Sequence, residues 1–218
     1  MGRALLAFLY HTVQEAMREG GAVKTPATSK GQRAKSLITE TAARLMHEKG
    51  IDATSIDDVL AASRTGKSQA YHYFSGKDDL VAAVLEFQFS RVMAAQPALH
   101  DETSTDLRRW RQEVLAANES GGFAGCPLGA FAGQLDGNTS LEALYADLFA
   151  RWQAALAALV DRATSAGRLP ASTSPDETAL VLLGALEGGS MLSHVRRRQD
   201  DLERMLDAAL ISVGVSQL

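Results

Sequence analysis

The apolar residues of the chain recur mostly at three- and four-residue spacing, which is the pattern of amphipathic α-helices. The first clear case follows Thr28 or Ser29, either of which suits an N-cap, and it stops at Gly50, which suits a helix end. The apolar face of this stretch carries Ala34, Leu37, Ile38, Thr41, Ala42, Leu45 and Met46. The sequence therefore predicts a helix over residues 29–49 with one continuous buried face.

Two short helices joined by a tight turn are expected next. Thr54 or Ser55 suits the N-cap of a helix with apolar positions 56, 59 and 60, and the turn follows at residues 63–66. A third helix over residues 67–74 would pack Ala70 and Phe74 inward, because side chains four apart share a helix face. Two short helices braced by a preceding helix make a helix-turn-helix unit.

The rest of the pattern is also helical. It predicts helices over about 77–97 and 103–118, a long helix from about Ser140 to Gly167, and helices over about 176–197 and 200–213. A short element is expected after the sequence Gly-Cys-Pro-Leu-Gly at residues 125–129. Alanine and leucine are abundant and only five prolines occur, so local preference favours helix throughout. The expected fold class is all-α, with an N-terminal three-helix helix-turn-helix domain and a larger C-terminal helical domain.

The net charge of −4 argues at first against a nucleic-acid partner, but its distribution does not. Residues 29–80 carry eight basic and seven acidic side chains, whereas residues 81–218 carry eleven and seventeen. The acidity therefore belongs to the C-terminal part, and the helix-turn-helix is free to approach phosphate.

Composition also sets expectations about compartment and cofactors. No charge-free stretch reaches the ~18 residues that a membrane-spanning helix needs, and the apolar run over residues 4–10 is a poor secretory signal. The single cysteine, Cys126, can form neither an internal disulfide nor a multi-cysteine metal site. We expect a cytoplasmic protein with no membrane contact, metal or cofactor. Residues 3–18 suit an amphipathic helix before a linker, or a segment without fixed structure, and both interpretations stay open.

The third helix of the unit would present hydrogen-bonding side chains to the outside. Glutamine can pair bidentately with adenine, lysine with guanine, and tyrosine or serine can contact phosphate or a thymine methyl group. A merely solvated helix more often carries glutamate and lysine. The outward positions are Lys67, Ser68, Gln69, Tyr71 and His72. They predict double-stranded DNA as a partner.

The same residues resemble the TetR family of transcriptional regulators. The sequence Tyr-His-Tyr-Phe at 71–74, Ser-Gly-Lys at 75–77 and Leu80 follows the family pattern, as does Thr-Ser-Ile-Asp-Asp-Val-Leu at 54–60. The resemblance implies that Thr54, Tyr73 and Lys77 hold phosphates, and that Thr65, Gly66, Lys67, Ser68, Gln69, Tyr71 and His72 lie in or beside a DNA groove. Two departures stand out: Arg64, where the family usually has glycine, and Ala70, where a bulkier residue is common.

Three regions follow from this resemblance. Residues 1–28 are an extension and linker, residues 29–80 the DNA-binding domain, and residues 81–218 a ligand-binding and dimerisation domain. The residues expected to wall an apolar ligand cavity are Phe87, Trp110, Phe123, Leu128, Phe131, Trp152 and Met191. Gly184, Gly188 and Gly189 are costly inside a lone helix, so we expect a partner's helix to pack there in a homodimer.

The function implied is that of a repressor that a small apolar ligand releases from a pseudo-palindromic operator. Two alternatives remain open. Cys126 could sense oxidants or electrophiles, although no cation lies near it in sequence to lower its pKa, or the protein could bind DNA without any inducer. No catalytic residue is predicted, because the five histidines are scattered and no phosphate-binding glycine loop follows a strand.

Overall fold

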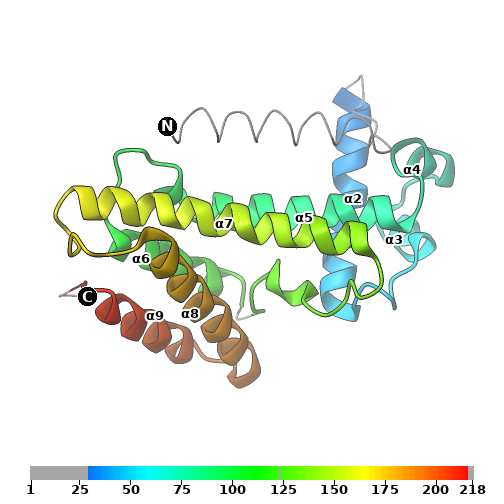
Figure 1. The fold of residues 1–218 in the computed structure, drawn as a ribbon. Helices are drawn as coiled ribbons and strands as arrows, with labels where there is room; N and C mark the ends of the chain where they lie inside the picture. Colours follow the sequence, from blue (N-terminus) through cyan, green and yellow to red (C-terminus); the bar gives the residue numbers. More distant parts are fainter. Residues whose placement is uncertain (1–28, 123, 216–218) are drawn as a thin grey trace.

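The computed structural model describes residues 29–122 and 124–215, which form an all-α fold (Figure 1). Its elements are α2 (Ser29–Lys49), α3 (Ile56–Ser63), α4 (Lys67–Tyr73), α5 (Lys77–Ala94), η1 (Pro97–Leu99), α6 (Leu107–Ser120), η2 (Gly129–Phe131), α7 (Thr139–Ser165), α8 (Pro175–Arg196) and α9 (Asp200–Ser212). The predicted fold class is therefore confirmed. The expectations for residues 1–28 and for Phe123 lie outside the described residues.

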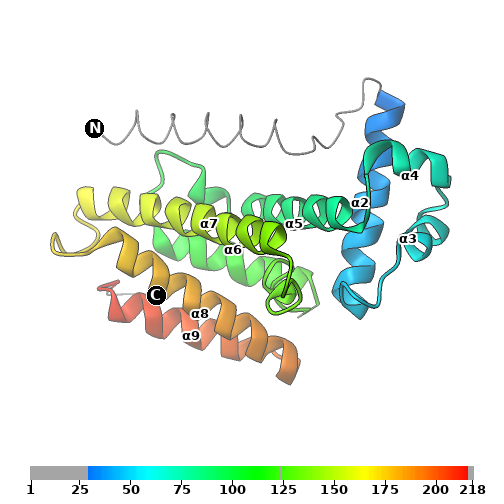
Figure 2. The ribbon, with the colours of Figure 1, turned by 45° about the vertical axis from the view of Figure 1, so that its right-hand side comes forward.

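The molecule has a small head and a larger body. Helices α2, α3 and α4 form the head, and α2 stands across the direction of α5 and α7, which run away from it side by side (Figures 1 and 2). Helix α5 packs against both α2 and α7, so it joins the head to the body. Helices α8 and α9 form a hairpin beside the body, in contact with α7 and α6 respectively.

The start of α3 is fixed by a capping box. The Ser55 hydroxyl accepts from the Asp58 backbone N–H at 3.1 Å, and the Ser55 N–H donates to the Asp58 carboxylate at 3.0 Å. Hydrogen bonds from Ser55 lower the pKa of Asp58. Of the two N-cap candidates the structure uses Ser55, and Thr54 has another role described below.

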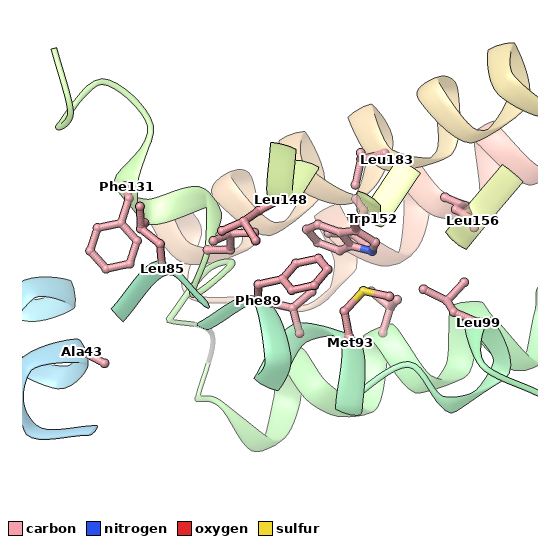
Figure 3. Close-up of a cluster of buried hydrophobic side chains, with 14 of the residues drawn as sticks. Ala43, Leu85, Phe89, Met93, Leu99, Phe131, Leu148, Trp152, Leu156 and Leu183 are labelled. Carbon is pink, nitrogen blue, oxygen red and sulfur yellow. The ribbon is translucent and has the colours of Figure 1, made fainter. Parts of the chain in front are cut away.

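One apolar cluster fills the body between α5, α7 and α8. Phe89 and Met93 from α5 lie against Leu148 and Trp152 from α7 (Figure 3). The buried Gln96 satisfies both tryptophans of the core, because its Oε1 accepts from the indole N–H of Trp110 at 2.7 Å and of Trp152 at 3.3 Å. A buried polar group with partners of this kind fixes the packing of its neighbours.

Two of the glycines in α8 serve contacts within the chain. A Cβ on Gly189 would lie 2.9 Å from the Leu202 backbone Cα in α9, and one on Gly188 would lie 3.3 Å from the Met205 methyl group. Only Gly184 faces open space. The expectation that a partner's helix explains all three glycines is therefore wrong for Gly188 and Gly189, which let α9 approach α8.

Among the described residues, α8 is the one helix long and apolar enough to cross a membrane by length and composition. In this fold it packs against α7 and α9, and 44% of its apolar window is buried inside the protein. A core helix meets the same test, so this is weak evidence for a membrane span.

Candidate functional site

The turn between α3 and α4 depends on a left-handed residue. Arg64 has φ 54° and ψ 36° and closes α3, with its N–H donating to the Leu60 carbonyl. The Ser63 and Thr65 hydroxyls share a hydrogen bond of 2.6 Å beneath the turn. A side chain in this backbone conformation is strained, which gives a physical reason for glycine at the equivalent place in similar sequences.

Helix α4 presents the predicted surface to solvent. Lys67, Ser68, Tyr71 and His72 are exposed and Gln69 is half-buried. Lys67 lies 3.3 Å from the Asp57 carboxylate and over the Tyr71 ring, but both charged groups remain largely exposed. An exposed ion pair of this kind holds little free energy, so the ammonium can exchange its partner for a phosphate or base.

The inner side of α4 packs on the head as predicted. Ala70 and Phe74 are 3% exposed, and the Lys35 ammonium lies 6.0 Å from the centre of the Phe74 ring. Burial lowers the pKa of Lys35. A void of about 10 Å³ remains beside Ala70 and Ile38, at the place where a bulkier residue would fit.

The three residues expected to hold phosphates lie differently from one another. Thr54 is 1% exposed, and its hydroxyl donates to the Gly50 carbonyl at 2.8 Å. Tyr73 is 7% exposed and packs between the rings of His72 and Phe74. Lys77 is half-buried, and its ammonium donates to the Asp52 carbonyl at 3.3 Å. The Thr54 side chain is therefore a structural brace, and Lys77 is the one of the three with a cation near the surface.

A cavity of about 660 Å³ lies where the head meets the body. Its walls come from the second half of α2, from α5, α6, α7 and α8, and from residues 124–127. Apolar groups of Ala43, Phe87, Val92, Val114 and Trp152 form much of the lining. Helices α3 and α4 with the turn between them are called the reading unit below. The cavity therefore touches both α2, on which the reading unit packs, and the core of the body.

Only part of the predicted cavity wall is correct. Phe87 and Trp152 line the cavity, whereas Trp110, Leu128 and Phe131 are completely buried and form core outside it. Met191 is 60% exposed on the outside of α8. Helical spacing predicts that a face is covered, but it does not distinguish a packed neighbour from an empty space.

No local pattern in the sequence predicts the polar part of the wall. Gln88 is 2% exposed on α5, and its Oε1 accepts from the Arg91 guanidinium at 3.3 Å. From α2 come Glu40, Arg44, His47 and Glu48. Their contribution depends on how the head is placed against the body, which no local pattern records.

Cys126 lies at the cavity wall beside a buried carboxyl group. Its Sγ accepts from the Gly129 N–H at 3.2 Å. Burial raises the pKa of the Cys126 thiol well above its ordinary value, and the neighbouring Glu187 raises it further. Burial likewise raises the pKa of Glu187. A thiol in such surroundings is mostly protonated and slow to react with electrophiles.

Most of the exposed large apolar side chains of the described residues lie on α8, and α9 adds one more. Of the seven large apolar side chains exposed in the described part of the chain, five lie on these two helices: Leu180, Val181, Met191, Val195 and Ile211. Gly184 lies on the same exposed side of α8. Within residues 29–122 and 124–215, no group of three or more His, Cys, Asp or Glu residues could hold a metal ion.

Both parts of the chain match known families. Residues 38–84 match the model for bacterial regulatory proteins of the tetR family, and residues 116–209 match the model for the tetracyclin repressor-like C-terminal domain. A transcriptional regulator of Cereibacter sphaeroides, AcuR, is 28% identical over 163 residues, which cover 71% of this chain and 74% of AcuR. The N-terminal match covers the turn and α4 described above.

Two further relatives extend the likeness to most of the chain. An uncharacterised HTH-type transcriptional regulator of Mycobacterium tuberculosis is 30% identical over 178 residues, which cover 77% of this chain and 86% of that protein. A TetR regulatory protein from Rhodobacter sphaeroides superposes with a TM-score of 0.72 at 25% identity, covering 81% of this chain and 96% of that one. The chain therefore belongs to the TetR family of transcriptional regulators, which bind operator DNA through a helix-turn-helix and are not enzymes.

Proposed function

We propose that this protein is a homodimeric repressor that a small, largely apolar ligand releases from a pseudo-palindromic operator. The observation that carries the proposal is the position of the cavity, whose wall includes the second half of α2. A ligand there contacts the head directly. To act as an inducer it must favour the DNA-incompetent arrangement by a few kcal/mol, because coupling of about that size changes affinity by orders of magnitude.

DNA reading is assigned to the exposed face of α4. Pairing with base edges is assigned to Gln69 and Lys67, with Ser68, Tyr71 and His72 beside them; the exposure of Lys67, Ser68, Tyr71 and His72 supports this assignment. Thr65 and Gly66 precede the helix. The Thr65 N–H already donates to the Leu60 carbonyl, so a phosphate contact here is assigned to the Thr65 hydroxyl or the Gly66 N–H. Lys77 supplies a phosphate contact once its ammonium leaves the Asp52 carbonyl.

Dimerisation is assigned to the outer face of α8 and α9. Its exposed apolar side chains form a patch that a second copy could cover in a four-helix interface. A two-fold axis through that interface would place the two α4 helices about one DNA turn, ~34 Å, or slightly more apart. Repression then follows from occupying the operator.

The test begins with selection of bound sequences from random duplex DNA. Lys77→Ala should weaken binding to every duplex and reduce its salt dependence, because one phosphate contact is lost. Gln69→Ala should instead relax sequence preference at one position of each half-site. Equal behaviour of the two variants would show that the roles are misassigned, and a dimer with no sequence preference at low salt would refute the repressor.

The alternatives make different predictions. A sensor acting through Cys126 requires alkylation or oxidation of this thiol to change operator binding, and the buried carboxyl beside it argues against fast reaction. A DNA-binding protein without an inducer requires that no compound of a dye, drug and fatty-acyl panel raises the melting temperature. A compound that stabilises the protein and weakens operator binding favours the proposed repressor over both.

A further inference from the structure

The segment 124–138, called the strap below, extends from the cavity to the head. Residues 124–127 line the cavity. At the other end, Gln134 Oε1 accepts from the Ile51 backbone N–H at 2.9 Å, and the Asn138 amide donates to the Asp78 carboxylate at 2.9 Å. The strap therefore touches the cavity with its first residues, the head through Gln134 and the start of α5 through Asn138.

The middle of the strap is fixed to the body. Leu128 and Phe131 are completely buried, and the Leu128 carbonyl accepts from the Tyr145 hydroxyl at 3.1 Å. The Gln134 amide group donates to the Ala130 carbonyl at 2.6 Å, which turns its oxygen toward Ile51. Both ends of the Gln134 amide are therefore engaged, one within the strap and one at the corner of the head.

The head receives this contact at the corner between α2 and α3. Gly50 has φ 89°, and a Cβ there would lie 3.2 Å from Gln134 Oε1. The Ile51 carbonyl accepts from the Thr54 N–H, and Thr54 also donates to Gly50. The corner is thus a tight unit one residue before the capping box of α3, and the cavity-lining half of α2 leads straight into it.

We infer that the Gln134–Ile51 hydrogen bond is a latch that holds the head in its DNA-binding position. A ligand in the cavity lies between α2 on one side and residues 124–127 on the other. Because the middle of the strap is fixed to the body, filling that space moves α2 relative to the strap and opens the latch, which frees the corner and the helices α3 and α4 that follow it. This inference rests on the proposed function, since it states how an occupied cavity weakens operator binding.

The experiment fills the cavity by chemistry, because the natural ligand is unidentified. Ala117 lines the cavity from α6, outside the two elements that the latch joins. In a Cys126→Ala background, Ala117→Cys is treated with benzyl methanethiosulfonate, which forms a mixed disulfide and releases methanesulfinate. Affinity for the selected operator is measured with and without the benzyl group. The measurement is made on two proteins, one that retains Gln134 and one that carries Gln134→Met. Gln112→Met, at an exposed position of α6, is the matched control.

The benzyl group should weaken operator binding by about tenfold or more when Gln134 is present, and by less than about threefold in Gln134→Met. The unlabelled Gln134→Met protein should already bind more weakly than the Gln112→Met control, and its Ile51 amide should exchange faster with deuterium. Gln134→Glu keeps an acceptor for Ile51 but loses the donor to the Ala130 carbonyl, so it should keep more of the response than Gln134→Met. Gln134→Leu removes both hydrogen bonds at similar volume and should abolish the response, which covers the case in which Gln134→Met folds poorly.

Two outcomes would overturn the latch. An equal loss of affinity in the Gln134 and Gln134→Met proteins would mean that the cavity acts on the head through α2 alone. No response to the benzyl group with Gln134 present would mean that this cavity is not coupled to DNA binding. Either result leaves sequence-specific DNA binding intact, whereas failure of the selection experiment would remove the proposed function itself.

Discussion

The packing of α8 on α9 can be tested with two neighbouring glycines that face different atoms. A Cβ added at Gly189 would lie 2.9 Å from the Leu202 Cα and 2.9 Å from its Cδ1, and the backbone atom cannot rotate away. A Cβ at Gly188 meets only the flexible end of Met205. Both changes to alanine gain about 0.5–1 kcal/mol of helix preference, so this contribution cancels when the two variants are compared.

What remains is the cost of overpacking at Gly189→Ala, about 1–3 kcal/mol. For a chain of this size each kcal/mol corresponds to about 2–4 °C in melting temperature. Unfolding in urea is followed by circular dichroism at one fixed protein concentration. The midpoint urea concentration should be lower for Gly189→Ala than for Gly188→Ala or the parent protein. Equal midpoints for the two variants would refute the close approach of α9 to Gly189. If Gly189→Ala changed only dimer dissociation, the glycine would serve a partner after all.

Three further predictions concern the head and the buried carboxyl group. Arg64→Gly should raise the free energy of unfolding by about 0.5–1 kcal/mol, because glycine accepts the left-handed conformation, and a loss on urea unfolding would contradict this. Ser55→Ala should cost about 1 kcal/mol by removing the capping box, whereas Ser68→Ala, at an exposed position, should leave stability unchanged. Burial raises the folded-state pKa of Glu187, so its stabilising contribution is present below the unfolded pKa and is lost as pH rises through the folded pKa. Thermal unfolding from about pH 4 to pH 8 should show Glu187→Gln gaining on the parent protein as pH rises, and a constant difference would argue against a raised pKa.

The head could be predicted almost completely from the sequence because its determinants are local. The turn at Arg64, the N-cap at Ser55 and the inward pair Ala70 and Phe74 each depend on residues within four positions. The errors there are small. The spacing puts Leu37 on the buried face of α2, but its side chain is 46% exposed and lies beside Arg33, Ser36 and Glu40. Thr54 resembles a phosphate contact in sequence, yet its hydroxyl is used to close the corner after α2.

The cavity could not be predicted in the same way. Trp110 and Trp152 have similar surroundings in the sequence pattern, and both are completely buried, but only Trp152 borders the cavity. The difference arises from where α2, α5 and α6 enclose the cavity, which is a property of the assembled fold. The pattern marks Gly188 and Gly189 as close-approach residues, but the approaching helix belongs to the same chain. In both cases the pattern indicated contact without identifying the partner.

Helix α2 makes contacts on two sides, and this arrangement decides how short the path from ligand to DNA can be. Ile38 on one side packs near Ala70 and Phe74 beneath the reading helix, while Ala43 and His47 on another side border the cavity. Once the Gln134–Ile51 hydrogen bond has opened, a ligand need not deform the whole body to reach α4, because one rigid helix carries both contacts. Since a packed helix moves as a unit, a small displacement at Ala43 is carried to the packing beneath α4. Operator binding demands a fixed spacing between two heads, so a displacement too small to unfold anything is sufficient to end it.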